Sequence, residues 1–188
     1  LVVRDSVSRK TQIKIIGSTF EKFGESIYDV DLWVEEAKKL GYSKIILCGH
    51  SFGCLKNLYY LNKKGMGNVD GVIFLSAPDT VGLINRSDDY KKLFEEAEKN
   101  IKARKSKRIL SRKLLGVFPI SSRTYYDFRK GSCVDIFPLV ENPEDFGILK
   151  KINKPVLMIL AENDSVIVRG AEEDLKILKE KVSKCHDF

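Results

Sequence analysis

A serine flanked by glycines is the feature of this sequence best suited to chemistry. Gly49, Ser51 and Gly53 fit the pattern G-x-S-x-G, between the apolar run 44–48 and a segment, 54–61, that is apolar at helical spacing. A tight turn from strand to helix forces such a serine into a strained backbone conformation and lifts its hydroxyl clear of the sheet. We expect the glycines on both sides to let this turn close without side-chain clashes.

The helix that follows the serine points its amino terminus at the same place. Its first N–H groups lack partners within the helix, so they can stabilise a negatively charged oxygen. The N–H of Phe52, directly after Ser51, is the candidate donor. The pattern therefore predicts a nucleophilic serine beside an oxyanion-binding group.

Apolar runs and helical spacing predict the elements that hold this turn. We expect strands over 44–49, 69–76 and 155–161, and helices over 26–40, 52–64 and 172–184. The strands are continuous apolar runs, which is typical of parallel strands covered on both faces. Strand, helix and strand within ~30 residues form a right-handed βαβ unit. Near the amino terminus, Ile13, Ile15 and Ile16 form either a short strand or an extended approach.

The segment from about 80 to 148 differs in character. It begins after Ala77-Pro78-Asp79 with an amphipathic helix over about 87–105, followed by basic residues and a stretch rich in Pro, Ser and Tyr. We predict one domain over 1–188, with a core of about 1–79 and 149–188 and a helical cap inserted over about 80–148. Its aromatic side chains either shape a pocket or pack the cap; packing is the simpler interpretation for most of them: Phe118, Tyr125, Tyr126, Phe128 and Phe137.

Composition and charge narrow the class of protein. The 188 residues are 43% hydrophobic with a net charge of +7, and no apolar run approaches the ~18 residues of a membrane helix. Eight basic residues and no acidic one lie over 99–113. We favour a solvated surface there over an anionic-substrate or nucleic-acid patch, because no aromatic residue interleaves the run and no nucleic-acid motif accompanies it. No signal peptide is visible, although the chain also begins without Met.

Four cysteines, Cys48, Cys54, Cys133 and Cys185, form no C-x-x-C pair. We interpret them as reduced and mostly structural, with Cys48 in a buried strand, which is consistent with a cytoplasmic location. The two histidines show no metal-ligand spacing with them. The sequence therefore predicts neither a metal site nor a cofactor.

The order of these features resembles the α/β-hydrolase fold, from about Phe23 onward and apart from the insert. The resemblance rests on Gly49-His50-Ser51-Phe52-Gly53, on Ser76-Ala77-Pro78-Asp79, and on 155–164, which ends Glu162-Asn163-Asp164. Gly17-Ser18-Thr19-Phe20-Glu21 is more loosely similar to the esterase branch that includes fungal siderophore esterases. The implied fold is a mainly parallel sheet flanked by helices, and the implied activity is that of a serine hydrolase without a cofactor.

The resemblance also implies roles for particular residues. Ser51 matches the nucleophile, and Asp164 matches the acid that orients a histidine and stabilises its charged form; Asp79 is the alternative acid. The Phe52 N–H matches one oxyanion donor. A second donor comes from a loop after an early strand in this family, and residues 1–20 contain no His-Gly stretch of that kind. We expect that donor upstream of Leu1.

The general base is the feature that the chain does not supply clearly. Only His50 and His186 occur. We expect the His50 side chain to point away from the Ser51 hydroxyl, toward sheet and helix packing. His186 follows the last predicted helix directly, whereas the family's histidine usually follows one further helix and strand, so a surface role is favoured over catalysis. We therefore expect the catalytic histidine beyond Phe188, and the isolated 188-residue chain to be inactive.

Three functions remain open from the residues. The leading one is hydrolysis of a small carboxylic ester or related acyl compound through an acyl-enzyme on Ser51. The second is ligand binding without turnover on a hydrolase scaffold, because fold does not fix function. The third is acyl transfer by the same triad to an acceptor other than water.

Overall fold

The computed structural model describes residues 2–4, 11–13, 15–130 and 147–182. At the amino terminus, β1 (Val2–Arg4) and β2 (Thr11–Ile13) form an antiparallel pair. Two short 3₁₀ helices, η1 (Gly17–Phe20) and η2 (Phe23–Glu25), then lead directly into α1 (Ser26–Lys39). The predicted helix over 26–40 is confirmed, and of the three isoleucines only Ile13 belongs to a strand.

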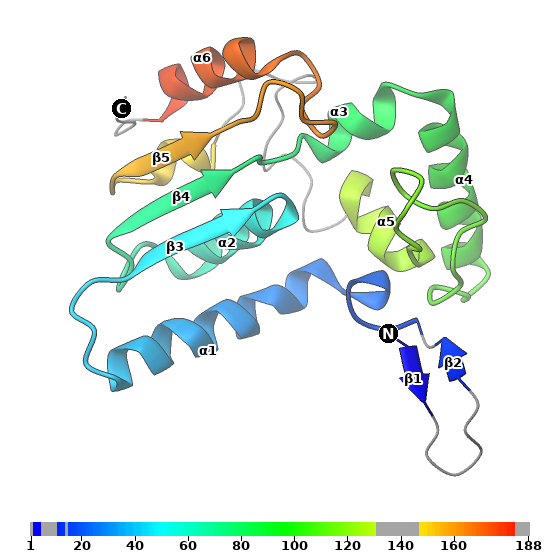
Figure 1. Cartoon of the computed structure of the whole chain (residues 1–188), viewed down its shortest axis with the longest axis horizontal. Coiled ribbons are helices and arrows are strands. Elements are labelled where there is room, and N and C mark those ends of the chain that lie inside the picture. The colour runs from blue at the N-terminus through cyan, green and yellow to red at the C-terminus, as the bar shows by residue number, and fades with distance from the viewer. Residues whose placement is uncertain (1, 5–10, 14, 131–146, 183–188) are drawn as a thin grey trace.

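A three-stranded parallel sheet forms the centre of the chain. Its strands are β3 (Ile46–His50), β4 (Gly71–Leu75) and β5 (Val156–Ile159), in the order β3-β4-β5. His50 lies opposite Leu75, and Leu75 lies opposite Ile159, so the three strands end together. The loops that carry chemistry in the sequence prediction therefore leave the sheet at one edge (Figure 1).

Helix α2 (Phe52–Lys64) connects β3 to β4 and lies behind the sheet in Figure 1. Its apolar side chains pack on the same face as Val72 and Phe74 of β4, and α1 packs against it. This buried cluster also takes in β5 and the carboxyl-terminal helix α6 (Ala171–Lys181). The predicted βαβ unit and the predicted last helix are confirmed, with α6 ending three residues before the predicted boundary of 184.

The other face of the sheet is uncovered by the described residues, which corrects the prediction of strands covered on both faces. Ile46, Cys48 and His50 are exposed, and no described helix crosses the front of the sheet in Figure 1. Trp33 of α1 and Leu40 at its carboxyl-terminal cap are also exposed. The apolar pattern thus identified strands and helix correctly, but the described chain supplies cover for one face only.

Three further helices form a second layer beside the sheet. They are α3 (Thr80–Asn85), α4 (Asp88–Lys102) and α5 (Ser122–Lys130), referred to below as the cap helices. They enclose their own apolar cluster around Leu93, Ala97 and Tyr125. The helix predicted over 87–105 is confirmed, whereas α3 and α5 were not predicted. Division of the chain into a core and an inserted cap stays a prediction.

Cysteines and basic residues divide between the interior and the surface. Cys54 is buried, but Cys48 is exposed, contrary to the prediction, because its side chain lies on the uncovered sheet face. Cys133 and Cys185 lie outside the described residues. All eight basic residues of 99–113 are exposed, as expected for a solvated surface. None of the helices in the described ranges is long and apolar enough to cross a membrane.

Candidate active site

The turn at Ser51 has the geometry that the sequence predicts. Ser51 has φ 53° and ψ −126°, directly between the end of β3 and the first residue of α2. An L-residue pays for a positive φ with strain that the surrounding structure must overcome. Two main-chain hydrogen bonds do so: Ser51 N donates to Leu75 O at 2.8 Å, and Cys54 N donates to Ser51 O at 2.9 Å. The serine is held by β4 on one side and by α2 on the other.

The two glycines of the motif play different parts. A Cβ on Gly49 would lie 2.7 Å from the backbone of both Gly53 and Cys54, a distance that side chains do not tolerate. A Cβ on Gly53 would meet nothing within 4 Å among the described residues. Gly49 is therefore required for the close approach of strand and helix, and the expectation of a steric need at Gly53 is wrong.

Cys54 stabilises this turn from the buried side. Its Sγ donates to Gly49 O at 3.1 Å and lies 3.3 Å from Leu75 O. Burial raises the pKa of the Cys54 thiol to about 12, against the smaller opposing effect of the hydrogen bond to Leu75. A thiol with this pKa stays protonated at neutral pH and is a poor nucleophile. The buried Cys54 thiol therefore supports the turn and is not suited to act as a nucleophile.

A cavity of about 220 Å³ opens beside Ser51. Ser51, Phe52 and Pro78 line it from the sheet side, and Ser18 and Glu21 line it from the segment before α1. The opposite wall comes from the cap helices and the segment between α4 and α5, and it is largely apolar: Thr80, Leu83, Leu114, Leu115, Phe118, Pro119, Ile120, Thr124 and Phe128. The cavity thus has the Ser51 turn at one end and an aliphatic and aromatic wall facing it.

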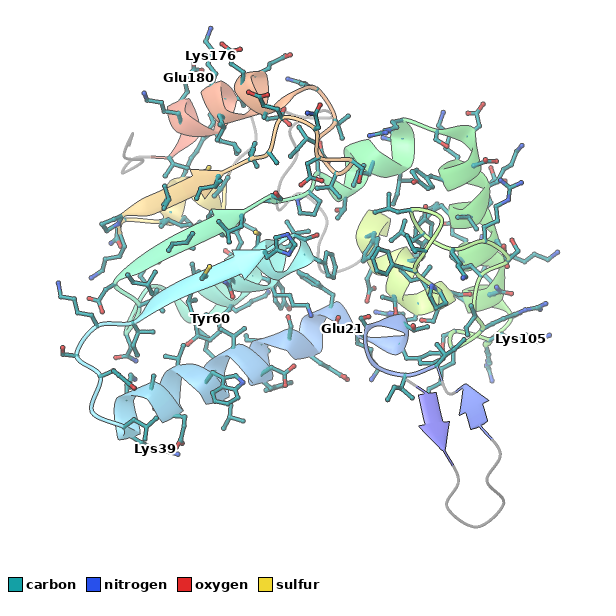
Figure 2. All side chains as sticks on the ribbon, in the orientation of Figure 1. Glu21, Lys39, Tyr60, Lys105, Lys176 and Glu180 are labelled. Carbon is teal, nitrogen blue, oxygen red and sulfur yellow. The ribbon has the colours of Figure 1, made fainter. Side chains whose placement is uncertain are left out.

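The polar side of the cavity carries a charge pair that the sequence analysis missed. Lys56 Nζ donates to Glu21 Oε1 across 35 residues of sequence, and Lys56 lies over the Phe52 ring at 5.9 Å from its centroid. Figure 2 shows Glu21 where the segment before α1 meets the cap helices. Lys56 follows Phe52 by one helical turn, but no local signal connects that helix to Glu21.

Buried hydroxyl groups fix the segment 17–21 to the cap helices. The Thr124 hydroxyl lies 3.1 Å from Thr19 O and 2.8 Å from Glu21 O, so its one hydrogen can be donated to either carbonyl oxygen. Thr19 Oγ1 donates to Pro119 O at 2.9 Å, and Ser121 N donates to Thr19 O at 2.9 Å. These contacts set the distance between the two walls of the cavity.

The structure brings the loop of Asp164 to the cavity. Asp164 follows β5, and its Oδ1 accepts a hydrogen bond from Val166 N at 3.0 Å; Val166 itself lines the cavity. Asp79 follows β4 and is buried, and its Oδ1 accepts from Gly82 N at 2.7 Å as the amino-terminal cap of α3. Both candidate acids therefore lie near the carboxyl end of the sheet, with Asp79 engaged in holding a helix.

The histidines do not join this group in the described chain. His50 is exposed on the uncovered face of the sheet, so the expected packing of its side chain against sheet and helix is wrong, because the described residues place no helix there. His186 lies outside the described residues. Of the predicted site residues, the structure therefore unites Ser51 and Phe52 at the cavity, with the Asp164 loop beside them.

Among the cap aromatics, Phe118 and Phe128 line the cavity, as the pocket interpretation requires. Tyr125 is fully buried and donates to Tyr90 O at 3.1 Å, while Tyr126 stacks on Phe94 at 5.8 Å between ring centroids. Packing thus accounts for the two tyrosines. Phe137 lies outside the described residues.

The fold at this site is that of the α/β-hydrolases. A solved monoacylglycerol lipase from Paleococcus ferrophilus superposes with a TM-score of 0.57 at 16% identity, over 90% of this chain and 66% of that one. An esterase from Exiguobacterium antarcticum gives a TM-score of 0.49 at 19% identity, over 90% of this chain and 65% of that one. The chain spans just under two thirds of the length of either neighbour.

The chain belongs to the family described as "Protein of unknown function (DUF1749)", whose model matches residues 23–185. No curated protein matches the chain. The match begins three residues before α1, so it includes the turn at Ser51, the cap helices and the Asp164 loop. The chain therefore belongs to this family and has the α/β-hydrolase fold.

Proposed function

We propose that this protein is a serine hydrolase that cleaves a carboxylic ester through an acyl-enzyme on Ser51. The observation that carries the proposal is the strained turn: Ser51, at φ 53°, borders a largely apolar cavity directly before the first N–H groups of α2. A serine held at this cost, where a carbonyl compound can reach it, is the arrangement that acyl transfer needs.

In the proposed reaction, Ser51 Oγ attacks the ester carbonyl carbon while a histidine takes the hydroxyl proton. The Phe52 N–H stabilises the oxyanion of the tetrahedral intermediate. The alcohol leaves with the proton from the histidine, and an acyl-enzyme remains. Water, deprotonated by the same histidine, then releases the carboxylic acid and restores Ser51.

Asp164 is the proposed partner of that histidine. The described residues contain one histidine, the exposed His50, which is not the proposed base. The carboxylate follows β5 in a loop whose Val166 borders the cavity. Asp79 is the weaker candidate, because one of its oxygens already caps α3. The order Ser51, acid, histidine along the chain is the order expected for this fold.

Ester hydrolysis by the full-length protein tests this proposal. Replacement Ser51→Ala is expected to lower kcat by about 10³-fold or more, since the hydroxyl has no substitute. Ser43→Ala, an exposed serine in the loop before β3, serves as the matched control and should leave the rate unchanged. A Ser51→Ala protein with undiminished hydrolysis would refute the proposal.

Asparagine replacements separate the two acids. Asp164→Asn is expected to lower kcat by about 10²-fold or more while the protein remains folded, because the histidine loses its orienting charge. Asp79→Asn is expected to lower thermal stability and to affect kcat less. The reverse pattern would assign the acid to Asp79.

A further inference from the structure

A second, smaller cavity of about 40 Å³ lies against the one beside Ser51. Five residues line both cavities: Thr80, Leu83, Leu114, Leu115 and Phe128. Ser51 borders only the larger cavity, whereas Ile84 and Tyr90 border only the smaller one. The two cavities therefore adjoin each other. The larger one begins at Ser51, and the smaller one lies beyond the shared side chains, among the cap helices.

The chemical character of the walls changes from the larger cavity to the smaller one. Near Ser51 the walls include Ser18 and Glu21, and the Glu21 carboxylate is paired with Lys56. Beyond them, Leu83, Leu114, Leu115 and Phe128 present aliphatic and aromatic surface. No charged side chain of the described residues lines the smaller cavity. A ligand that fits has a polar reacting end and an uncharged apolar tail.

Volume sets the length of that tail. A water-sized group takes on the order of 30 Å³, so a cavity of about 220 Å³ holds roughly seven such groups. The smaller cavity, of about 40 Å³, adds room for about one more. Leu83 borders both spaces from α3 and is half-buried, so its side chain can change size without loss of the core.

We propose that the larger cavity binds an uncharged aliphatic acyl chain of about seven carbons, and that Leu83 sets this limit by separating it from the smaller cavity. The assignment of the carbonyl end to Ser51 rests on the function proposed above. The length limit rests on the cavities alone, so it can be measured without turnover.

Straight-chain 2-alkanones of increasing length test the proposal by calorimetry on the full-length protein. These ketones carry a carbonyl like that of an ester but are not hydrolysed. Each methylene that enters the cavity is expected to raise affinity about fourfold, which corresponds to ~0.8 kcal/mol. The rise should stop when the carbonyl carbon and the tail together count about seven carbons. Affinity that is independent of length, or that rises without a limit, would overturn the proposal.

Variants at Leu83 locate the limit. Leu83→Ala joins the two cavities and is expected to move the limit to longer chains by about one to two carbons, whereas Leu83→Phe is expected to shorten it. Leu32→Ala, an equal truncation on the exposed face of α1, should leave the limit in place. A limit that moves in neither Leu83 variant, with both proteins folded by thermal unfolding, would also overturn the proposal.

Ketone binding and ester hydrolysis, measured on the same proteins, test the acyl cavity and the proposed reaction separately. The Ser51→Ala protein is expected to retain the length limit while losing hydrolysis. If the protein shows Ser51-dependent hydrolysis but ketone affinity has no length limit, only the proposed acyl cavity is rejected. If the length limit is present but the protein hydrolyses no ester, only the proposed reaction is rejected.

Discussion

The turn at Ser51 and the cap helices reach the same cavity by different physical means. The turn is held by main-chain hydrogen bonds between neighbours in the sheet and in α2, such as Ser51 N to Leu75 O at 2.8 Å. The cap helices are held to segment 17–21 mainly by the side-chain hydroxyls of Thr124 and Thr19, beside one main-chain bond from Ser121 N to Thr19 O. The proposed reactive group is thus fixed by backbone geometry, and the wall facing it mainly by side-chain contacts.

This difference suggests that the two regions respond differently to substitution. Backbone contacts tolerate no added atoms at a position such as Gly49, whereas side-chain contacts and apolar walls allow changes of size and shape. Single substitutions in the turn should therefore be disruptive, whereas substitutions in the apolar wall should change the proposed tail preference while the protein stays folded.

The largest expected effect comes from the closest backbone approach. Gly49→Ala would place a Cβ at 2.7 Å from two backbone atoms, and we expect a loss of about 3 kcal/mol or more in the free energy of unfolding. Gly53→Ala is the matched control: with nothing within 4 Å of its Cβ in the described chain, it should be neutral or stabilising by up to ~1 kcal/mol. Equal losses in urea unfolding would contradict the distinction.

A buried acid of α6 gives the next effect. Asp174 is 1% exposed, and among the described residues neither of its side-chain oxygens has a hydrogen-bond partner. Burial raises its pKa from the ordinary 3.8 to about 6; Asp79 and Glu173 add to this, and Arg169 opposes it. The folded state therefore binds this proton more tightly than the unfolded chain does.

The sign of the pH dependence follows from that preference. Stability from this group is greatest below about pH 4 and declines as pH rises through 4 to 6, where the folded protein must give up the proton. Asp174→Asn is expected to stabilise the protein by about 2 kcal/mol above pH 6 and by little below pH 4. Thermal unfolding at both pH values checks this, and a pH-independent difference would contradict it.

The smallest of these effects concerns the cap. Thr124→Val removes the hydroxyl that binds Thr19 O and Glu21 O, so we expect a loss of about 1–2 kcal/mol in the free energy of unfolding. Thr124→Ser keeps the hydroxyl and should recover most of this loss. If valine and serine destabilise equally, packing rather than hydrogen bonding holds this wall.

The same contrast explains how much could be predicted from sequence. The strand, turn and helix around Ser51 depend on local signals, namely an apolar run, two glycines and helical spacing, and all three elements were predicted. Helix α5 was missed because its first residue, Ser122, is bonded to Asn100 and to the carbonyl of Arg108, which lie in other segments. The helix is also short, and its first turn includes Ser, Thr and Tyr, which have modest helix propensity.

The cavity walls show the same limit. Ser51 and Phe52 were predicted at the site, and Phe118 and Phe128 were considered for it. Leu83 and Leu114 could not be assigned, because Leu83 lies in the unpredicted helix α3 and Leu114 lies in the segment between α4 and α5, whose path no local signal gives. The exposed sheet face was mispredicted for a related reason. An apolar run shows that a strand is suited to burial, but it does not show which other residues cover that strand.

The most direct test of the central claim is covalent labelling of the full-length protein with a fluorophosphonate probe, followed by mass spectrometry. An activated serine nucleophile reacts with such a probe, whereas ordinary serines do not. The account predicts one adduct, on Ser51, that is absent from the Ser51→Ala protein. A folded full-length protein with no adduct, or with its adduct on another residue, would contradict the assignment of Ser51 as the nucleophile.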